Sequence, residues 1–247
     1  MDKVKIFENE LKSIASDDVR QFAEKAIELL PDYFFEVAAS STGKYHPSYA
    51  LGNGGLVRHT KAAVRFAVHV FELEQLRDEF DSFQRDLIIT ALILHDGWKH
   101  GTDGSMYTTH EHPITAANWI RECDDLNGII SNYDREIISG LVASHMGQWC
   151  KTNRSKVVLP KPQTSMQKFV HLCDYLASRK DIEVLFDKSE PLEEKAENSL
   201  EEYVLNFGKH NGELLIDVYK NDPGYIRWLK GTEIRNHTLK AFLNKLN

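Results

Sequence analysis

A histidine and an aspartate stand side by side at the end of the longest apolar run of the chain. His95 and Asp96 directly follow the stretch Leu87 to Leu94. A charged carboxylate after a buried run is costly unless it is paired or bound to a cation. At a helix end, the two side chains can both turn toward one ion and offer it an imidazole nitrogen and a carboxylate oxygen. Mixed N/O sites of this kind suit Mn, Fe, Zn, Ni or Co.

Further histidines and an aspartate stand at other points where helices are predicted. His59 lies in GGLVRHT, and Asp174 lies in FVHLCDYL between apolar neighbours, where a carboxylate again needs a partner. Separate helices can therefore bring two histidines and two aspartates to one centre, as metal sites in helical bundles do. His112 in HEHP and His145 in ASHMGQW each begin or end a predicted helix and could complete a second metal position. His110 competes with His112 for that role.

The chemistry that this set of residues predicts is phosphoryl hydrolysis. Two metal ions a few ångströms apart can clamp a phosphoryl group and lower the pKa of a water molecule to about 7. Asp96, bridging both ions, would orient the nucleophile. Lys99 follows Asp96 by three positions, which places both side chains on the same side of the helix end. Lys99 is therefore a candidate contact to substrate phosphate. The other candidate substrate-binding residues are His46, Arg58 and Arg154, the last in a basic loop.

These motifs resemble a known family over about residues 45 to 185. HDGWK fits the HDxxK signature of the HD superfamily of phosphohydrolases, and the order H…HD…H…H…D is that of its binuclear members. Within the superfamily, HPSYALGNGGLVRHT, LILHDGWK, ASHMGQW and the late aspartate most resemble the YhaM-type 3′–5′ exoribonucleases. The resemblance implies a catalytic role for Asp96 and for Lys99, which would touch a substrate phosphate. The metal ligands that it implies are His59, His95, Asp96 and Asp174 for the core and His112 and His145 for a second ion.

Helices are the elements that would position these residues. Apolar residues recur at helical spacing, and loops rich in Gly, Ser, Asn and Pro separate the segments. Asp81 or Ser82 is expected to begin the helix that ends at the His-Asp pair. No convincing alternating strand occurs before residue 190, so residues 1–190 are expected to form an all-α helical HD-domain bundle. The predicted helices cover residues 4–30 (with a break near 16–18), 56–79, 83–95, 113–123, 134–145 and 164–185.

The composition changes after an acidic candidate linker at residues 190–199. Short strands are expected at 203–207 and 213–217 and helices at 222–229 and 238–246, giving a small α+β C-terminal module over 200–247. The segment FGKHNGELLIDVYKNDPGYIRWLKG resembles the GKxxG…DPxYxxWL module appended to exonucleases of the exodeoxyribonuclease X type, over about residues 203 to 247.

This C-terminal module has two open interpretations. Its polar and aromatic side chains could bind phosphate and stack on bases, which predicts contact with nucleic acid. Alternatively, the aromatic residues form the core of a minidomain, and seven Lys/Arg against six Asp/Glu from residue 201 onward is nearly neutral. The candidate phosphate contacts are Lys209, His210, Lys220, Arg227 and Lys230, and the candidate stacking residues are Tyr225 and Trp228.

The overall composition limits the class of protein in which this chemistry would take place. The chain has 247 residues, of which 42% are hydrophobic and 27% charged, as is ordinary for a soluble globular protein. A net charge of −7 argues against binding nucleic acid by bulk electrostatics but leaves room for a local basic pocket. Three widely spaced cysteines argue against a disulfide framework. With no apolar run long enough for a membrane and no signal-peptide core, a cytoplasmic protein without membrane contact is expected.

The sequence thus favours a metal-dependent phosphohydrolase that cleaves phosphodiester bonds of nucleotides or single-stranded oligonucleotides. The cofactors would be one or two divalent ions, chosen from Mn, Fe, Zn, Ni, Co and Mg. One alternative is a 5′-nucleotidase or deoxynucleoside triphosphohydrolase with a single metal, in which His112 and His145 grip phosphate. Two others are a di-iron oxygenase and a non-catalytic HD module that binds nucleotides. The sequence leaves the substrate, the metal and the oligomeric state open.

Overall fold

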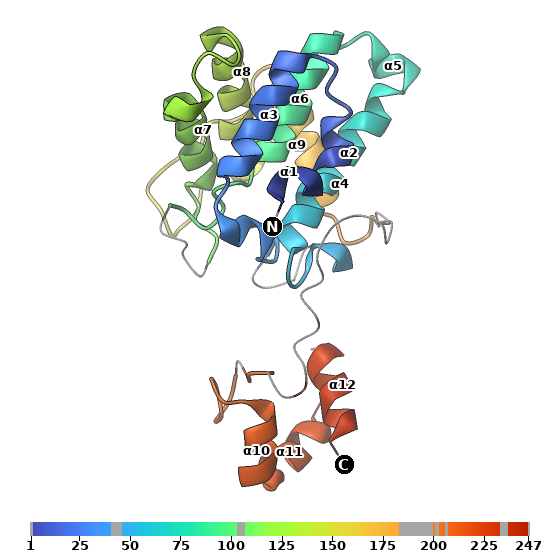
Figure 1. Cartoon of the computed structure of the whole chain (residues 1–247), viewed down its shortest axis with the longest axis vertical. Coiled ribbons are helices and arrows are strands. Elements are labelled where there is room, and N and C mark those ends of the chain that lie inside the picture. The colour runs from blue at the N-terminus through green and yellow to red at the C-terminus, as the bar shows by residue number, and fades with distance from the viewer. Residues whose placement is uncertain are drawn as a thin grey trace. The chain divides into compact units, whose positions relative to one another are not determined.

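The computed structural model describes residues 2–40, 46–102, 107–182, 200, 203–205, 207–232 and 237–246. The chain divides into two compact units, Met1–Leu192 and Glu193–Asn247, and helices dominate both (Figure 1). The predicted linker at 190–199 lies outside the described residues. None of the described helices has the length and apolar character that a membrane crossing requires.

The N-terminal unit is a bundle of helices, as the sequence predicted. Two helices are shorter than expected: the one predicted over 56–79 ends at Phe71 and the one predicted over 164–185 ends at Ala177. Its α-helices are α1 (Lys3–Ile6), α2 (Glu8–Leu11), α3 (Asp17–Leu29), α4 (Gly55–Phe71), α5 (Glu74–Arg77), α6 (Ser82–Leu94), α7 (His112–Glu122), α8 (Asn132–Ala143) and α9 (Ser165–Ala177). Its 3-10 helices are η1 (Asp32–Phe35), η2 (Ser48–Ala50), η3 (Asp124–Leu126) and η4 (Gly147–Trp149).

Helix α6 is the central element of this bundle. It begins with a capping box in which Asp81 and Gln84 exchange side-chain to backbone hydrogen bonds. Every residue from Asp86 to Leu94 is buried, which is the pattern of a helix surrounded by others. It packs against α3, α4, α8 and α9 (Figure 1). Helix α6 therefore ends deep inside the unit, and His95 directly follows its last residue.

A buried carboxylate on α6 fixes the break that the sequence predicted near residues 16–18. Asp86 accepts hydrogen bonds from the backbone N–H groups of Ala15 at 2.9 Å and Ser16 at 2.8 Å. Ser16 in turn caps α3 by accepting a hydrogen bond from the backbone of Val19. The N-terminal segment is thereby joined to the helix that carries the His-Asp pair.

Two adjacent glycines explain how α4 begins. Gly54 has a φ of 68°, in the left-handed region that favours glycine. A Cβ on Gly55 would lie 2.3 Å from the carbonyl oxygen of Ala50. The turn into α4 therefore requires glycine at both positions, and it sets the direction in which His59 enters the core.

Helix α4 also carries a buried ion pair whose loss is expected to destabilise the unit. Lys61 Nζ lies 3.2 Å from Glu10 Oε2, and the exposed fractions of the two side chains are 0% and 3%. Burial lowers the pKa of Lys61, and Glu10 opposes that shift. Lys61→Met leaves the Glu10 carboxylate buried and unpaired, so the free energy of unfolding should fall by about 3–5 kcal/mol. Urea denaturation followed by circular dichroism measures the change.

The matched control for this pair is the double variant Lys61→Met with Glu10→Leu. Because it removes both charges, it should recover most of the stability that the single variant loses. A double variant as unstable as the single one would show that lost packing, rather than an unpaired charge, causes the effect.

The C-terminal unit is helical where a strand was predicted. Its helices are α10 (Leu215–Asn221), α11 (Pro223–Lys230) and α12 (His237–Lys245). Among its described residues, the only strand-like pairing is one isolated bridge between Val204 and Leu214. The strand predicted at 213–217 is therefore wrong. Leu215 and Val218 are both buried, three positions apart on one helix face, and a short apolar run does not by itself distinguish a strand from a helix.

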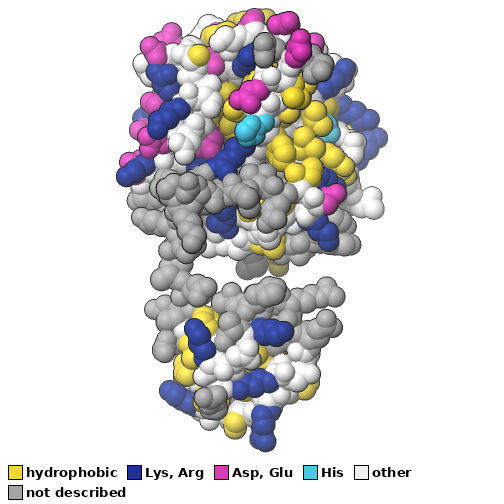
Figure 2. Space-filling view, turned by 90° about the vertical axis from the view of Figure 1, so that its right-hand side faces the viewer, with side chains coloured by type: hydrophobic (Ala, Val, Ile, Leu, Met, Phe, Trp, Pro, Cys, Tyr) yellow, Lys and Arg dark blue, Asp and Glu magenta, His cyan; other side chains and the backbone are white. Residues whose placement is uncertain are grey.

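The described core of this unit is apolar, and its surface carries basic side chains. Figure 2 shows several Lys and Arg side chains on the visible face of the C-terminal unit, with no Asp or Glu visible among the described residues. The buried core residues are Tyr203, Leu205, Leu215, Val218, Ile226, Leu229, Leu239, Phe242, Leu243 and Leu246.

Candidate metal centre

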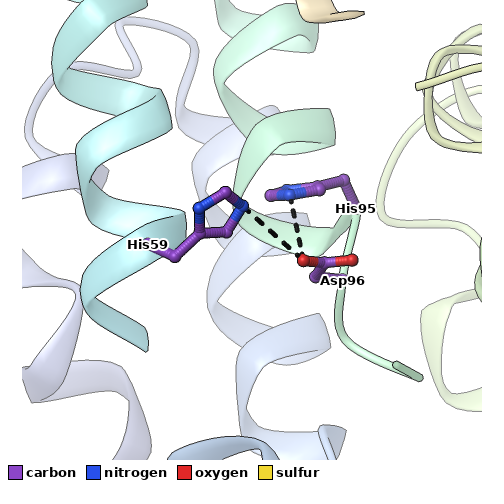
Figure 3. Close-up of side chains that lie close together, drawn as sticks. All are labelled: His59, His95 and Asp96. Atoms are coloured by element: carbon purple, nitrogen blue, oxygen red, sulfur yellow. Dashed lines mark ion pairs between the residues drawn. The ribbon is translucent and has the colours of Figure 1, made fainter. Parts of the chain in front are cut away.

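The structure brings all of the predicted metal ligands together in the N-terminal unit. Five of the six form two overlapping groups, His59 with His95 and Asp96, and Asp96 with His112 and His145, in which the ligand atoms lie within 4.8 Å of one another. All five of these residues are buried. His59 extends from α4, and His95 and Asp96 extend from the end of α6, toward one another (Figure 3). These buried groups could bind a metal ion.

The two carboxylate oxygens of Asp96 face different partners. Oδ2 lies 3.4 Å from His95 Nε2 and 3.7 Å from His59 Nε2. Oδ1 lies 3.1 Å from His112 Nε2 and 3.7 Å from His145 Nε2. One carboxylate thus stands between two pairs of histidines.

Asp174 on α9 completes the first of these groups. Its Oδ1 lies 3.0 Å from His59 Nε2 and 3.5 Å from His95 Nε2. Its side chain is 17% exposed, in contrast to the 1% of Asp96. The first group therefore offers two histidines and two carboxylates, with Asp174 on its more open side.

Backbone carbonyls orient three of the four histidines of these groups. Nδ1 of His95, His112 and His145 is hydrogen-bonded to the carbonyl oxygen three residues earlier, at 2.6, 2.7 and 2.7 Å respectively. A carbonyl oxygen only accepts, so each Nδ1 carries a proton, and each ring presents an Nε2 lone pair to the centre once Nε2 is deprotonated. This is the usual arrangement of a metal-ligating histidine.

The lone pairs of this arrangement fit a cation. His112 Nε2 and His145 Nε2 lie only 3.2 Å apart. His95 Nε2 and Asp96 Oδ1 are buried and have no hydrogen-bond partner among the described residues. Buried polar atoms are rarely left unsatisfied. A divalent ion that takes both nitrogen and oxygen ligands would satisfy them.

The electrostatics keep most of these groups in the protonation state that metal binding requires. Burial raises the pKa of Asp96, but Lys99 and His95 outweigh it and hold that pKa well below the usual range. Burial likewise raises the pKa of Asp174, and the hydrogen bond to His59 together with the charge of His95 brings it well below normal. Burial, together with His95 and His112, lowers the pKa of His145 to about 3. Both carboxylates are therefore ionised and His145 is neutral at neutral pH, as metal ligands are.

His95 differs from His145 because the carboxylates dominate its surroundings. Burial lowers its pKa, but Asp96 and Asp174 reverse that effect and raise it to about 10. In the absence of a metal ion, His95 thus carries a positive charge between the two carboxylates.

A cavity of about 600 Å³ opens onto the candidate ligands. Its volume is in the range of small-molecule sites. Lys99, which follows Asp96 by three residues, lies in this lining and contacts the Asp96 carboxylate. The residues that line the cavity are Ala39, Ser40, His46, Asp96, Lys99, Thr108, His112, His145, Met146, Trp149, Asp174, Ser178 and Arg179.

The predicted substrate-binding residues differ in where the structure places them. His46 lines the cavity, its ring 5.3 Å from that of His59 and its Nδ1 buried without a hydrogen-bond partner among the described residues. Arg58 is not in the lining, because its guanidinium donates to backbone carbonyls of the loop that precedes α4. Arg154 is exposed and also outside the lining. His110 is bonded to the carbonyl of Val157 at 3.2 Å, so His112 takes the central position.

The sequence prediction missed several cavity residues, among them Trp149 and Arg179. Trp149 follows His145 by four positions, and Arg179 follows Asp174 by five, so both come about one helical turn after a predicted ligand. Spacing alone does not identify them, because residues five positions apart do not face one another on a helix and both side chains are placed by their contacts with Tyr175.

A tyrosine joins the loop beside His46 to the helix that carries Asp174. The Tyr49 hydroxyl donates to the carbonyl oxygen of Ala177 at 3.0 Å, and burial raises its pKa to about 12. An unfolded tyrosine has a pKa of about 10, so its contribution to stability is complete below pH 10 and is lost as the pH rises toward 12. Tyr49→Phe should lower the melting temperature at pH 8 and make its decline between pH 9.5 and 11 shallower.

Thermal denaturation over this pH range tests the effect. Burial also raises the pKa of Tyr33 to about 12. The melting temperature of Tyr49→Phe should therefore still decline somewhat at alkaline pH. Tyr133→Phe is the control, because Tyr133 is 75% exposed and should change neither quantity. The prediction would be contradicted if the melting temperatures of Tyr49→Phe and the wild type fell equally steeply between pH 9.5 and 11.

In the C-terminal unit, two of the predicted phosphate contacts are occupied by carboxylates. Lys209 Nζ lies 2.8 Å from Asp222 Oδ2, and His210 Nε2 lies 3.0 Å from the same oxygen. Hydrogen bonds to Asp222 and Glu213 raise the pKa of His210. Tyr225 is half-buried against His210, with ring centroids 4.8 Å apart. Lys209 and His210 are therefore paired with Asp222.

The remaining candidates in this unit are accessible. Lys220 and Arg227 are exposed and form no ion pair with a described residue. Lys230 is exposed as well and donates to the carbonyl oxygen of Leu246. Trp228 is 56% exposed and packs on Tyr225 with ring centroids 5.3 Å apart.

Comparison with known proteins identifies one part of the chain. Residues 205–232 match the exodeoxyribonuclease X-like C-terminal family, as the resemblance of the C-terminal segment predicted. No curated protein and no solved structure matches the chain. The similarity therefore lies in the C-terminal unit.

Proposed function

We propose that this protein is a metal-dependent phosphohydrolase of the HD type, which cleaves phosphodiester bonds of nucleotides or oligonucleotides in the cavity of the N-terminal unit. The observation that carries the proposal is the position of Asp96, whose two oxygens face separate pairs of histidines. A carboxylate in that position can bridge two divalent ions, and paired ions a few ångströms apart are typical of phosphoryl hydrolysis.

The first position would be held by His59, His95, Asp96 and Asp174, and the second by Asp96, His112 and His145. When bound, the ions would acidify a water molecule and offset negative charge on the phosphoryl group. The residues of the chain would orient the ligands and exclude water. The carbonyl-anchored imidazoles keep their lone pairs on the centre, and the burial of Asp96 excludes bulk water from the ligand set.

Lys99 is the proposed contact to the substrate phosphate. Its ammonium group lies at the cavity wall beside Asp96, where a phosphate oxygen that approaches the centre would meet it. A cation at this point stabilises charge that builds up on phosphate oxygens during displacement. His46, which also lines the cavity, is proposed to contact the substrate on the side of His59.

The protonation states weigh against the single-metal alternative. A nucleotidase in which His112 and His145 both grip phosphate would need each ring to present an N–H to it, and the Nδ1–H of His145 is already bonded to the carbonyl oxygen of Val142. Burial and the neighbouring His95 and His112 lower the pKa of His145 to about 3, which keeps that ring neutral. A neutral Nε2 lone pair repels a phosphate oxygen and favours a metal ion.

The C-terminal unit supports a nucleic-acid substrate. It is similar to a module named for an exodeoxyribonuclease, and its exposed Lys220, Arg227 and Trp228 offer phosphate contacts and a stacking face. We propose that this unit holds single-stranded nucleic acid while the N-terminal unit cleaves it.

Elemental analysis combined with a substrate panel tests the function. The purified protein should contain a transition metal, lose turnover in EDTA and regain it with Mn²⁺ or Co²⁺. The panel contains RNA and DNA octamers, nucleoside monophosphates and deoxynucleoside triphosphates, and the octamers should be shortened. Release of inorganic phosphate from monophosphates alone would identify a nucleotidase instead. No hydrolysis of any substrate with any metal would overturn the proposal.

A further inference from the structure

One wall of the cavity consists of residues that are not metal ligands. Trp149 of η4 stacks on Tyr175 of α9, with ring centroids 5.6 Å apart and an interplanar angle of 14°. Although Tyr175 covers part of it, Trp149 remains 43% exposed and lines the cavity. A large aromatic side chain so exposed beside a polar centre offers a surface for stacking.

This aromatic wall is tied to the metal centre by short connections. Tyr175 directly follows Asp174 on α9. His171, whose ring lies 5.9 Å from that of Trp149, is bonded through Nδ1 to the carbonyl oxygen of His145 at 2.7 Å. The position of Trp149 is thereby fixed relative to a ligand of each proposed metal position.

The backbone at Gly147 lies very close to the His171 side chain of α9. It has a φ of 56°, and a Cβ at this position would lie 2.3 Å from the His171 ring. Glycine is thus required for the turn that carries Trp149 to approach α9.

Arg179 places a cation on the same wall. Its guanidinium carbon lies 4.5 Å from the centroid of the Tyr175 ring, and Nη2 donates to Ser178 Oγ at 3.1 Å. Nε is buried without a hydrogen-bond partner among the described residues, and no described carboxylate lies within 4.0 Å of the guanidinium. An arginine that lines an acidic metal cavity and has donors to spare suits a phosphate oxygen.

We propose that Trp149 and Arg179 form a recognition subsite for one nucleotide unit, in which the base stacks on Trp149 and Arg179 binds a phosphate. The inference rests on the proposed function and deepens it, because it names the part of the substrate that the cavity recognises. Both side chains contact Tyr175 and line the same cavity, so a stacking face and a phosphate donor are available to one ligand there. A cavity of about 600 Å³ is of the size that small-molecule ligands occupy.

Equilibrium binding in EDTA tests this subsite without turnover. The probes are 5′-AMP, ribose 5-phosphate and an octameric oligonucleotide, measured on the full chain by calorimetry and tryptophan fluorescence. Trp149→Leu should weaken 5′-AMP binding by about 5- to 100-fold, the range expected for losing one base stack. Its affinity for ribose 5-phosphate should stay unchanged. Arg179→Met should weaken both.

Control variants separate recognition from folding. Leu172→Ala changes an exposed apolar residue of α9 that does not line the cavity, and Arg121→Met removes an exposed arginine. Both should bind the probes like the wild type. Trp149→Phe keeps an aromatic face and should recover part of the 5′-AMP affinity. Quenching of fluorescence by 5′-AMP should disappear in Trp149→Leu, although three of the four tryptophans remain.

The outcomes distinguish this inference from the proposed function. If the wild type hydrolyses phosphodiesters but Trp149→Leu binds 5′-AMP as tightly as the wild type, the subsite is wrong and the function stands. If no metal supports hydrolysis but 5′-AMP affinity depends on Trp149, the subsite stands and the function is wrong. Equal losses for ribose 5-phosphate and 5′-AMP in Trp149→Leu would overturn base stacking. An octamer that binds with the same dependence would show that the subsite also recognises a nucleotide unit within an oligonucleotide.

Discussion

Replacing Asp96 with asparagine is expected to remove bound metal and to lower turnover by about 10³-fold or more. A metal ion contributes several kcal/mol of charge stabilisation in such reactions, and each 1.36 kcal/mol of barrier is about tenfold in rate. The carboxamide keeps the size of the buried side chain but offers one neutral oxygen where two charged ones stood. Because both proposed metal positions share this residue, the loss should affect both.

Metal content and phosphodiester turnover should be measured on the same preparations of Asp96→Asn. The control is Asp18→Asn, an exposed carboxylate in the first turn of α3, which should leave both quantities unchanged. Far-UV circular dichroism should show that the helices remain, because α6 packs through its apolar residues. Substantial turnover by a folded, metal-free Asp96→Asn protein would exclude the proposed chemistry.

Substitution of one histidine from each pair is expected to divide the centre into two separable positions. His59→Gln should reduce the ions bound near Asp174, and His112→Gln should reduce those bound on the other side of Asp96. Each variant should retain about one metal ion per chain if the wild type binds two. Turnover should fall by at least about 10²-fold in either variant, because both ions are needed to clamp the phosphoryl group.

Metal stoichiometry is the decisive measurement, made by elemental analysis after equilibrium dialysis against Mn²⁺. His110→Gln is the matched control, since His110 is bonded to a loop carbonyl rather than facing Asp96. A wild type that binds one ion, which His59→Gln abolishes and His112→Gln leaves in place, would support the single-metal alternative.

The helical framework could be predicted because local signals agree with the tertiary contacts. Asp81 begins α6 where a capping residue was expected, and the apolar run after it is buried on all sides. The convergence of the ligands could also be predicted from residue type, since a carboxylate such as Asp174 between apolar neighbours needs a charged or metal partner. The close approach of His59, His95 and Asp96 agrees with that prediction.

Other features depend on information that the sequence does not hold locally. The run at 213–217 is too short for its periodicity to identify a helix, and the packing of Leu215 and Val218 decides it. Arg58 stands beside His59, yet consecutive helical residues point in different directions, and its guanidinium turns to loop carbonyls instead. Trp149 and Arg179 acquire their position only through Tyr175, which a reading of separate motifs does not reveal.

The hydrogen bonds from His95, His112 and His145 to backbone carbonyls bear on the stage at which a metal ion would bind. Each ring is held by the main chain of its own segment, so its orientation is set by folding and not by the cation. Under the proposed function, the apoprotein would hold these three rings in the orientation that a metal ion requires, and the ion could bind after folding. Metal availability would then contribute, together with ligand type and geometry, to which element is bound.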